Sequence, residues 1–443
     1  MTSKAALLLA AAALGPGGAH HPVPPQPGDV LSALERRAAA HATLSGKIEH
    51  VVIIVQENRS FDNLFQGYPG ADTVPSGLNS LGQTIPLAPV GLSDRYQIGH
   101  SVFDSLAACD GSPPGQNCKM DGFNNEVQIG GPANGQYVYV PHRQTKPYFA
   151  MANEFVLADR MFASQIDESF VAHQYLIAGQ ANGAVDVPNL EWGCSGSLSD
   201  QVTTLNKSRG IGPSEAPCFD YKTIGDELDE AHLSWRFYTS VLSGDGGWWS
   251  GYQAVRHIRY GPDWQTDIVT PQTQFITDVG NGKLANVTWI TPICRNSDHV
   301  NCGSKTGPDW VASLVNAVGE SKLWPTTAVF VLWDDWGGTY DHVPPPYADY
   351  DGLGFRVPLI AISPYAKHGY VTHVQYETAS VLRFAEDTFG LASLAASDAR
   401  ATDPAGDCFD FTQPPRPFVP IPTNLGRAYF MRQHDDGRPP DDG

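Results

Sequence analysis

The chain has little positive charge and no run of basic residues. Only 28 of its 443 residues are Lys or Arg, against 47 Asp and Glu, which gives a formal net charge of -19 at pH 7. Proteins that bind nucleic acids usually carry a basic surface that contacts the phosphate backbone. The composition therefore excludes nucleic acid as an expected partner. A site for a phosphate group would need its own positive centre, such as a metal ion, unless the charge serves only solubility.

The chain also lacks a hydrophobic run long enough to cross a bilayer. Its N-terminal apolar stretch, residues 5–14, has about ten residues, roughly half of what a transmembrane helix needs. This stretch follows Lys4 and precedes small residues, which is the pattern of a secretory signal. A disordered Ala-rich tail is the alternative. We predict a signal peptide over residues 1–20 and a secreted or periplasmic protein.

Cysteines are few, and their spacing does not match a zinc site. Six of the seven fall in near pairs: Cys109 and Cys118, Cys194 and Cys218, Cys294 and Cys302. Short-range disulfides in loops suit an exported protein, although the spacing alone does not prove the pairing. Cys408 is left over, either free or bonded elsewhere, and no motif supports a catalytic cysteine.

From residue 48 onward, strand-like and helix-like segments alternate. Short apolar runs predict strands at 50–56, 234–239, 286–291, 328–333 and 357–362, and helical spacing predicts helices at 222–231, 309–319 and 376–389. Alternation of this kind predicts an α/β fold in which helices cover both faces of a mainly parallel sheet. We therefore expect a three-layer α/β/α sandwich.

The domain organisation follows from composition. Residues 66–150 and 181–220 are rich in Gly, Pro and Ser, and we interpret them as long loop insertions that shape a substrate mouth. The predicted organisation is a signal peptide (1–20), a linker with a short helix (21–47), a catalytic domain (48–402) and a loosely packed tail rich in Pro and Asp (403–443).

Two predicted strands end abruptly in oxygen-bearing side chains. The segment HVVIIVQENRSFD runs apolar and then stops at Glu57 and Asn58, and AVFVLWDD stops at Asp334 and Asp335. In open α/β sheets, ligands and metals bind at this end of the strands. Adjacent aspartates also repel each other unless a cation neutralises them. We predict that these four residues hold one divalent metal ion; a capping turn and an acidic turn are the alternatives.

Further segments carry candidates for catalysis. Asp298 and His299 follow the predicted strand NVTWITP, and a carboxylate beside an imidazole can orient it and raise its basicity, although such a pair is as often structural. Ser169 precedes a predicted helix, where its hydroxyl either caps the helix or acts as a nucleophile beside a base or a metal. His342 follows on the loop after the two aspartates, and His100 has weaker local support.

Together these segments resemble the bacterial phosphoesterase family, which holds acid phosphatases and non-specific phospholipases C. The family's ENRSFD signature occurs in IEHVVIIVQENRSFDNLF. Further family blocks resemble SDHVNCGSKTGPDWVASLVNAVG, WDDWGGTYDHVPPP, GFRVPLIAISPYAKHGYV and ETASVLRFAEDTFGL, in the family's order and over most of residues 48–392. The resemblance implies an alkaline-phosphatase-like sandwich with a metal at the strand ends.

The resemblance also implies roles for single residues. The resemblance assigns metal binding to the four residues at the strand ends, Glu57, Asn58, Asp334 and Asp335. Ser169 stands six residues before Tyr175, as the nucleophilic Ser or Thr does in the family's T-x-P-N-R-x-Y pattern. His299 matches the family's Asp-His block, His100 matches a histidine of its substrate pocket, and His342 matches its Y-D-H-V position. The predicted catalytic residues are therefore Ser169, His299, His100 and His342.

The sequence departs from the family pattern at several places, among them the nucleophile pattern and the ENRSFD signature. Val171, Ala172 and His173 replace the Pro-Asn-Arg part of the nucleophile pattern, so a residue that can hold phosphate is changed. His173 either binds phosphate instead or simply packs. Asn63 stands where the ENRSFD signature often continues with His.

These observations predict a metal-dependent phosphoric ester hydrolase that forms a phosphoserine intermediate. Its substrate is a phospholipid, as for a phospholipase C, or another phosphate ester, as for an acid phosphatase. The oxygen ligands favour Ca, Mg or Mn over a thiolate-bound Zn, without deciding the identity of the ion. The alternatives are a non-catalytic secreted binding protein that retains the fold, or a sulfatase-like hydrolase, although its C/S-x-P-x-R motif is absent.

An aromatic-rich stretch bears on the choice of substrate. It contains Trp248, Trp249, Tyr252 and Trp264. Such side chains could contact lipid or choline during a transient encounter with a membrane surface, or they could support a loop.

Overall fold

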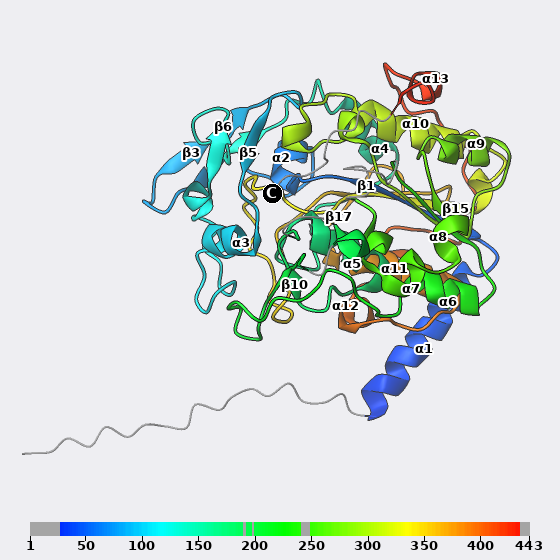
Figure 1. Cartoon of the computed structure of the whole chain (residues 1–443). Helices are drawn as coiled ribbons and strands as arrows, with labels where there is room; N and C mark the ends of the chain where they lie inside the picture. The colour runs from blue at the N-terminus through cyan, green and yellow to red at the C-terminus, as the bar shows by residue number, and fades with distance from the viewer. Residues whose placement is uncertain (1–26, 189–191, 197–198, 241–248, 435–443) are drawn as a thin grey trace, which may run out of the picture.

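A central sheet of eight strands organises the computed structural model, which describes residues 27–188, 192–196, 199–240 and 249–434 (Figure 1). The strand order is β13-β12-β14-β1-β15-β16-β8-β17. Only β16 runs antiparallel to its neighbours β15 and β8; the other strands share one direction. The strands are β1 (His50–Gln56), β8 (Val156–Ala158), β12 (Trp235–Tyr238), β13 (Ile268–Val269), β14 (Val287–Ile290), β15 (Thr327–Trp333), β16 (Leu359–Ile362) and β17 (Tyr370–Thr372).

Helices cover both faces of this sheet (Figure 1). One face carries α4 (Lys146–Glu154), α9 (Gln274–Gly280) and α10 (Gly307–Gly319). The other carries α5 (Ser169–Ala178), α6 (Ile224–Glu230) and α11 (Ala379–Phe389), with α1 (Pro27–Leu44) packed on α11. The predicted α/β/α sandwich with a mainly parallel sheet is confirmed.

The two central strands are buried along almost their whole length. Every residue of β15 is buried, and in β1 only His50 is partly exposed. Strands covered on both faces have no solvent side, so their sequences read as nearly continuous apolar runs. This is why β1 and β15 were predicted to within one residue. The strands at 268–269, 156–158 and 370–372 are too short to give a pattern, and the sequence did not predict them.

The first insertion forms a cap at the end of the molecule where α2 (Phe61–Phe65) follows β1 (Figure 1). We call residues 66–140 the cap. It holds the strand pairs β2 (Ser76–Leu78) with β3 (Thr84–Pro86), and β5 (Tyr96–Ile98) with β6 (Gln128–Gly130), together with helix α3 (Val102–Cys109). The second insertion contains the short pair β10 (Ala184–Val185) and β11 (Thr203–Thr204).

The Pro- and Asp-rich tail is anchored to the rest of the chain by a few buried residues within 403–434, between exposed ones. Phe409 stacks on Phe384 of α11 with ring centroids 5.2 Å apart. Ile421 is buried, and its backbone exchanges two hydrogen bonds with the Asn316 side chain of α10. The Pro and Asp residues set the composition of this segment, but the apolar residues between them decide its packing.

All three near pairs of cysteines form disulfides: Cys109–Cys118, Cys194–Cys218 and Cys294–Cys302. Cys408 is a buried free thiol. Among the described residues, no helix has both the length and the apolar character to cross a membrane. The predicted signal peptide over residues 1–20 lies outside the described residues.

Candidate active site

The ends of β1 and β15 bring the four predicted metal ligands together. The two strands pair in parallel with Gln56 opposite Trp333, so Glu57 and Asn58 leave the sheet beside Asp334 and Asp335. The backbone pairing continues past the strands, because the Asp334 N–H donates to the Gln56 carbonyl at 3.0 Å. Convergence of these two distant segments, which the sequence predicted, is therefore present in the structure.

Asn58 is held in a defined orientation. Its backbone has a φ of 56°, a left-handed conformation that Asn tolerates better than most residues, and its N–H donates to Asp334 Oδ1 at 2.9 Å. Its side-chain Nδ2 donates to His100 Nε2 at 2.9 Å and to Asp335 Oδ2 at 3.3 Å. A carboxylate oxygen can only accept, so the amide nitrogen must face Asp335 and Oδ1 faces Ser169 Oγ at 3.4 Å.

The glycine turn after Asp335 lets two backbones approach closely. Gly337 has a φ of 57°, and a Cβ placed on it would lie 2.2 Å from the carbonyl oxygen of Asn58. Its N–H donates to Asp335 Oδ1 at 2.7 Å. Glycine is therefore required here, both for the conformation and for the space that Asn58 occupies.

Helix α5 presents two polar side chains to these strand ends. Ser169 is its first residue, and its Oγ lies 3.2 Å from Asp335 Oδ2. His173 stands four residues later on the same face of the helix. Its Nε2 lies 3.3 Å from both carboxylate oxygens of Glu57 and 3.7 Å from Asp334 Oδ2. The sequence left His173 as a phosphate-binding or packing residue; its spacing from Ser169 was the available signal for a place in the site.

The cluster concentrates negative charge in a buried place. Glu57, Asp334 and Asp335 are fully buried, and Asp334 Oδ2 accepts no hydrogen bond from the described part of the chain. Buried carboxylates are costly unless a cation or donors compensate them. Carboxylate, amide and imidazole groups are ordinary ligands of divalent metals, and donor atoms of Glu57, His173 and Asp334 lie within 4.8 Å of one another. The residues therefore fit a divalent metal ion.

Two of the predicted catalytic histidines lie near each other beside this cluster. The rings of His100 and His299 have centroids 6.3 Å apart. His100 Nδ1 donates to the Ile98 carbonyl at 2.9 Å, which leaves Nε2 as the acceptor for Asn58 in the neutral ring. His299 has the opposite tautomer, because its Nδ1 accepts from the Asn301 N–H at 3.1 Å and its Nε2 then carries the proton.

The sequence suggested that Asp298 orients His299. In the structure its carboxylate has other partners. Its Oδ2 accepts from the Tyr148 hydroxyl at 2.7 Å and from Trp333 Nε1 at 3.1 Å. Its backbone carbonyl accepts from Arg59 Nε at 2.8 Å. Burial raises the pKa of Asp298 to about 6, although the hydrogen bond from Tyr148 opposes this shift. Asp298 therefore anchors its loop to β15 and to the segment after β1.

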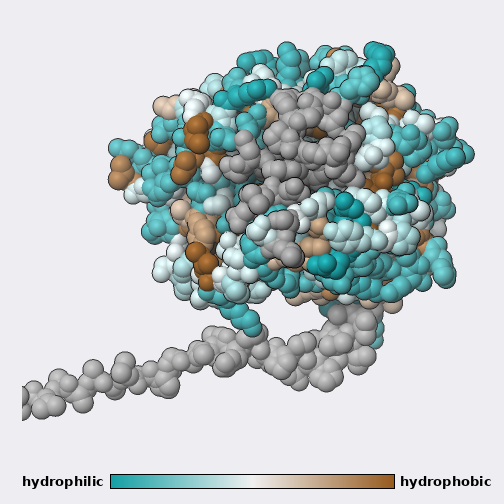
Figure 2. Space-filling model, viewed as in Figure 1, coloured by the Kyte–Doolittle hydropathy of each residue, from teal (hydrophilic) through white to brown (hydrophobic). Residues whose placement is uncertain are grey.

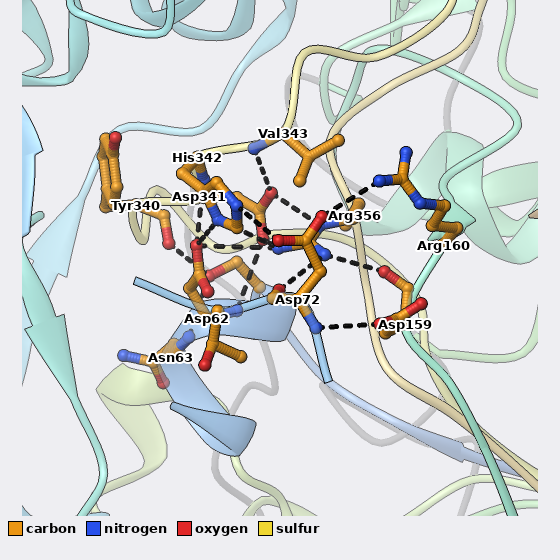
Figure 3. Close-up of polar contacts among 12 residues, drawn as sticks. Asp62, Asn63, Asp72, Asp159, Arg160, Tyr340, Asp341, His342, Val343 and Arg356 are labelled. Carbon is orange, nitrogen blue, oxygen red and sulfur yellow. Dashed lines mark hydrogen bonds and ion pairs between the residues drawn. The ribbon is translucent and has the colours of Figure 1, made fainter. Parts of the chain in front are cut away.

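His342 belongs to a separate ionic network, which Figure 3 shows. Its Nδ1 lies 2.6 Å from Asp62 Oδ2, and its Nε2 lies 3.1 Å from Asp72 Oδ1. Arg356 joins the network through Asp341, with Nε–Oδ1 and Nη2–Oδ2 distances of 2.8 and 3.0 Å. These partners differ from the residues around Ser169. The structure thus places His342, which the sequence predicted as catalytic, in contacts that tie the loop after β15 to α2 and the cap.

The network makes stability depend on pH. Burial alone would lower the pKa of His342, but its hydrogen bond to Asp62 and the charges of Asp62 and Asp341 outweigh burial and raise it. The folded state then binds the proton more tightly than the unfolded chain does. The contribution of His342 to stability is therefore full below about pH 6.5 and is lost as pH rises through the raised pKa.

We expect His342→Gln to destabilise the protein by about 1–2 kcal/mol at pH 5.5, the scale of a hydrogen bond to a charged group, and by much less at pH 9. Urea unfolding of both proteins at the two pH values measures the difference. If the variant loses as much or more unfolding free energy at pH 9 as at pH 5.5, the charged form of His342 contributes nothing to stability.

The aromatic stretch proposed as a lipid contact is largely internal. Tyr252 is fully buried and stacks on Trp235 with ring centroids 4.7 Å apart. Trp249 is also buried, with its ring centroid 6.5 Å from that of His299. Trp264 packs against Arg259. Trp248 lies outside the described residues. The described members therefore support the core and the site from within, because their rings fill space between elements.

Known proteins are similar in sequence to most of this chain. The model of the Phosphoesterase family matches residues 48–392. Phospholipase C B of Mycobacterium tuberculosis is 26% identical over 441 residues, covering 84% of this chain and 80% of its own. Non-specific phospholipase C1 of Arabidopsis thaliana is 24% identical, covering 79% and 68%. Non-hemolytic phospholipase C of Burkholderia pseudomallei is 23% identical, covering 77% of this chain and 55% of its own.

The match to the family model spans most of the chain and all of the strand-end residues. The chain belongs to the Phosphoesterase family. It is a hydrolase of phosphoric esters.

Solved structures resemble the chain more distantly. The PsFucS1 sulfatase from Pseudoalteromonas sp. aligns with a TM-score of 0.41 at 11% identity, covering 88% of this chain and 78% of its own. A protein of the alkaline phosphatase superfamily from Vibrio parahaemolyticus aligns with a TM-score of 0.37 at 11% identity, covering 82% and 76%. The strand order and the two helical layers described above define the fold of this chain.

Proposed function

We propose that the chain is an exported, metal-dependent phospholipase C that works through a phosphoserine intermediate at Ser169. The observation that carries the proposal is the position of the Ser169 hydroxyl. It lies at the first residue of α5 and within 3.4 Å of side-chain oxygens of Asn58 and Asp335, which leave two neighbouring strands. A buried hydroxyl among carboxylates at the carboxyl ends of the strands has the surroundings that a nucleophile requires.

A divalent ion held by Glu57, Asn58, Asp334 and Asp335 would lower the pKa of the serine hydroxyl and neutralise charge on the phosphoryl oxygens. The chain's own groups do the rest. Asp335 Oδ2 can accept the Ser169 proton as Oγ attacks phosphorus. Because Ser169 begins α5, the phosphoryl oxygens would lie near the N-terminal end of this helix, where free N–H groups and the helix dipole favour negative charge.

The two nearby histidines take different roles in this proposal. His100 fixes the amide of Asn58, so that Asn58 Oδ1 faces the nucleophile. His299, with its proton on Nε2, would give that proton to the leaving oxygen as the ester P–O bond breaks. Water would then attack phosphorus and pass a proton to His299, while Asp335 returns its proton to Ser169 Oγ as the serine–phosphorus bond breaks.

The surface of the cap favours a lipid substrate. Its exposed apolar side chains lie at the end of the molecule where β1 delivers the site, and Figure 2 shows apolar surface at that end. They are Leu78, Leu81, Phe103, Val127 and Ile129. Exposed apolar side chains gathered near a site mark contact with a membrane or another apolar partner. The names of the relatives point to the same substrate class.

Export is part of the proposal. Three disulfides close loops within the described residues. Structural disulfides form and persist mainly in oxidising compartments. The three disulfides therefore support export, as does the signal peptide that we predict from the N-terminal sequence.

A comparison of two substrates tests the proposal. The purified protein should release diacylglycerol from phosphatidylcholine vesicles with a kcat/KM at least about tenfold above that for p-nitrophenyl phosphate, because only the lipid uses the apolar cap. That preference should shrink for Leu81→Ser/Ile129→Ser, two exposed positions of the cap that the proposed catalytic step does not use. Hydrolysis of the aryl phosphate alone would make the protein an acid phosphatase. Metal binding without hydrolysis of either substrate would leave only a binding protein.

A further inference from the structure

We propose that His173 is itself a ligand of the divalent ion, through Nε2, and that this nitrogen makes the site prefer Zn²⁺ to Ca²⁺ and Mg²⁺. The inference rests on the proposed function, because it requires an ion beside Glu57 and Asp334. The set of metal ligands predicted from the sequence contained only oxygen donors. The inference adds a nitrogen donor to that set.

The spacing of the donor atoms carries the inference. His173 Nε2 lies 3.3 Å from Oε1 and 3.3 Å from Oε2 of Glu57, and 3.7 Å from Asp334 Oδ2. Two ligands that each lie about 2.1 Å from one metal are separated by about 3.0 Å at octahedral corners and about 3.4 Å at tetrahedral ones. A single N–H cannot point well at three oxygens, whereas a shared ion accounts for all three separations.

The packing of α5 fixes the imidazole in this position. His173 is 1% exposed, and the ring of Trp192 lies beside it with centroids 6.4 Å apart. The His173 carbonyl lies against Gly251, where an added Cβ would approach it to 2.5 Å. Neither the ring nor its backbone can move far, so Nε2 is held toward the carboxylates before any ion arrives. Preorganised ligands of this kind raise affinity by reducing the cost of ordering.

The chemistry of the donors sets the selectivity. Ca²⁺ and Mg²⁺ bind oxygen donors almost exclusively, whereas Zn²⁺ binds imidazole and carboxylate together. A buried set of two carboxylates and one imidazole, from Glu57, Asp334 and His173, matches the donor types of a catalytic zinc site. Asn58 and Asp335, the other two proposed ligands, lie beside Ser169 Oγ, where substrate and nucleophile would meet.

Metal binding, measured without any assay of activity, tests the inference. The full-length protein is stripped with a chelator and titrated separately with Zn²⁺ and Ca²⁺, alongside His173→Ala and His173→Gln. Loss of a buried ligand should weaken Zn²⁺ binding on the order of 100-fold, while Ca²⁺ binding should change by less than about threefold. His50→Ala is the matched control, because it removes an imidazole from the opposite end of β1.

X-ray absorption at the zinc edge gives a second readout, and its first arm uses the wild-type protein alone. The wild-type protein should show scattering from an imidazole ligand, and His173→Gln should lose it. Unchanged imidazole scattering, or an unchanged ratio of Zn²⁺ to Ca²⁺ affinity, would overturn the role of His173 and leave the proposed function standing. A wild-type protein that binds no divalent ion would overturn both.

Discussion

Ser169→Ala should lower kcat for ester hydrolysis by on the order of 10⁴-fold or more, because removal of a nucleophile leaves only binding and electrostatic catalysis. The hydroxyl makes two long hydrogen bonds, of 3.2 and 3.4 Å, with Asp335 and Asn58. Their loss should cost about 1 kcal/mol of stability or less. Steady-state kinetics and thermal unfolding of the same preparation separate the two effects.

Two further variants sharpen this prediction. Ser169→Thr keeps a hydroxyl and should retain part of the activity. Ser105→Ala, the matched control, removes a buried hydroxyl of α3 for which the described residues provide no hydrogen-bond partner, so kcat and stability should both stay near wild type. Mass spectrometry of acid-quenched wild-type enzyme should find, on the peptide that contains Ser169, phosphocholine after reaction with phosphatidylcholine and phosphate after reaction with p-nitrophenyl phosphate. Activity of Ser169→Ala within about tenfold of wild type would rule out Ser169 as the nucleophile.

The strand ends were predictable because three independent signals agree there. The apolar runs of β1 and β15 are long, both stop at polar residues, and parallel neighbours necessarily deliver those residues to one edge. The register that places Asp334 beside Glu57 follows from the pairing of these two strands. Sequence reasoning could therefore assemble the site from segments almost 280 residues apart, as the separation of Asn58 and Asp335 shows.

Side-chain partners in loops were not predictable in the same way. Asp298 stands next to His299 in the chain, yet its carboxylate bonds to Tyr148 and Trp333, which arrive from other elements. His342 belongs to a recognisable motif, yet Asp62 and Asp72 hold its ring. Neighbours in the sequence are close along the chain, but the direction of each side chain depends on the backbone conformation. In a loop the backbone has no regular repeat, so the sequence does not predict that direction.

His173 shows an intermediate case. The four-residue spacing from Ser169 places both on one face of a helix, and this spacing was visible in the sequence. The exact start of α5 was not, and a helix that began two residues later would leave Ser169 outside it. Because the helix begins at Ser169, its first two turns aim both side chains at the ends of β1 and β15.

Arg356→Met should destabilise the protein by about 3–5 kcal/mol, the usual cost of leaving a buried carboxylate without its partner. The guanidinium is fully buried and bonds both oxygens of Asp341. It also donates to the backbone carbonyls of Asp72 and Asp159, at 3.0 and 2.7 Å. It thereby joins the loop after β15 to the cap and to β8. Met fills part of the same space beside Phe61, and it removes the charge, the donors and the contact of the guanidinium with the Phe61 ring.

Arg160→Met provides the matched control, because Arg160 pairs with the same network through Asp72 but is 41% exposed. An exposed pair contributes little, so this variant should lose less than about 1 kcal/mol. The double variant Arg356→Met/Asp341→Leu should recover part of the loss, since it removes the stranded carboxylate as well. Urea unfolding measures all four proteins. If Arg356→Met loses no more unfolding free energy than Arg160→Met, the buried guanidinium does not hold the loop. Packing alone would then position the segment that carries Asp334 and Asp335.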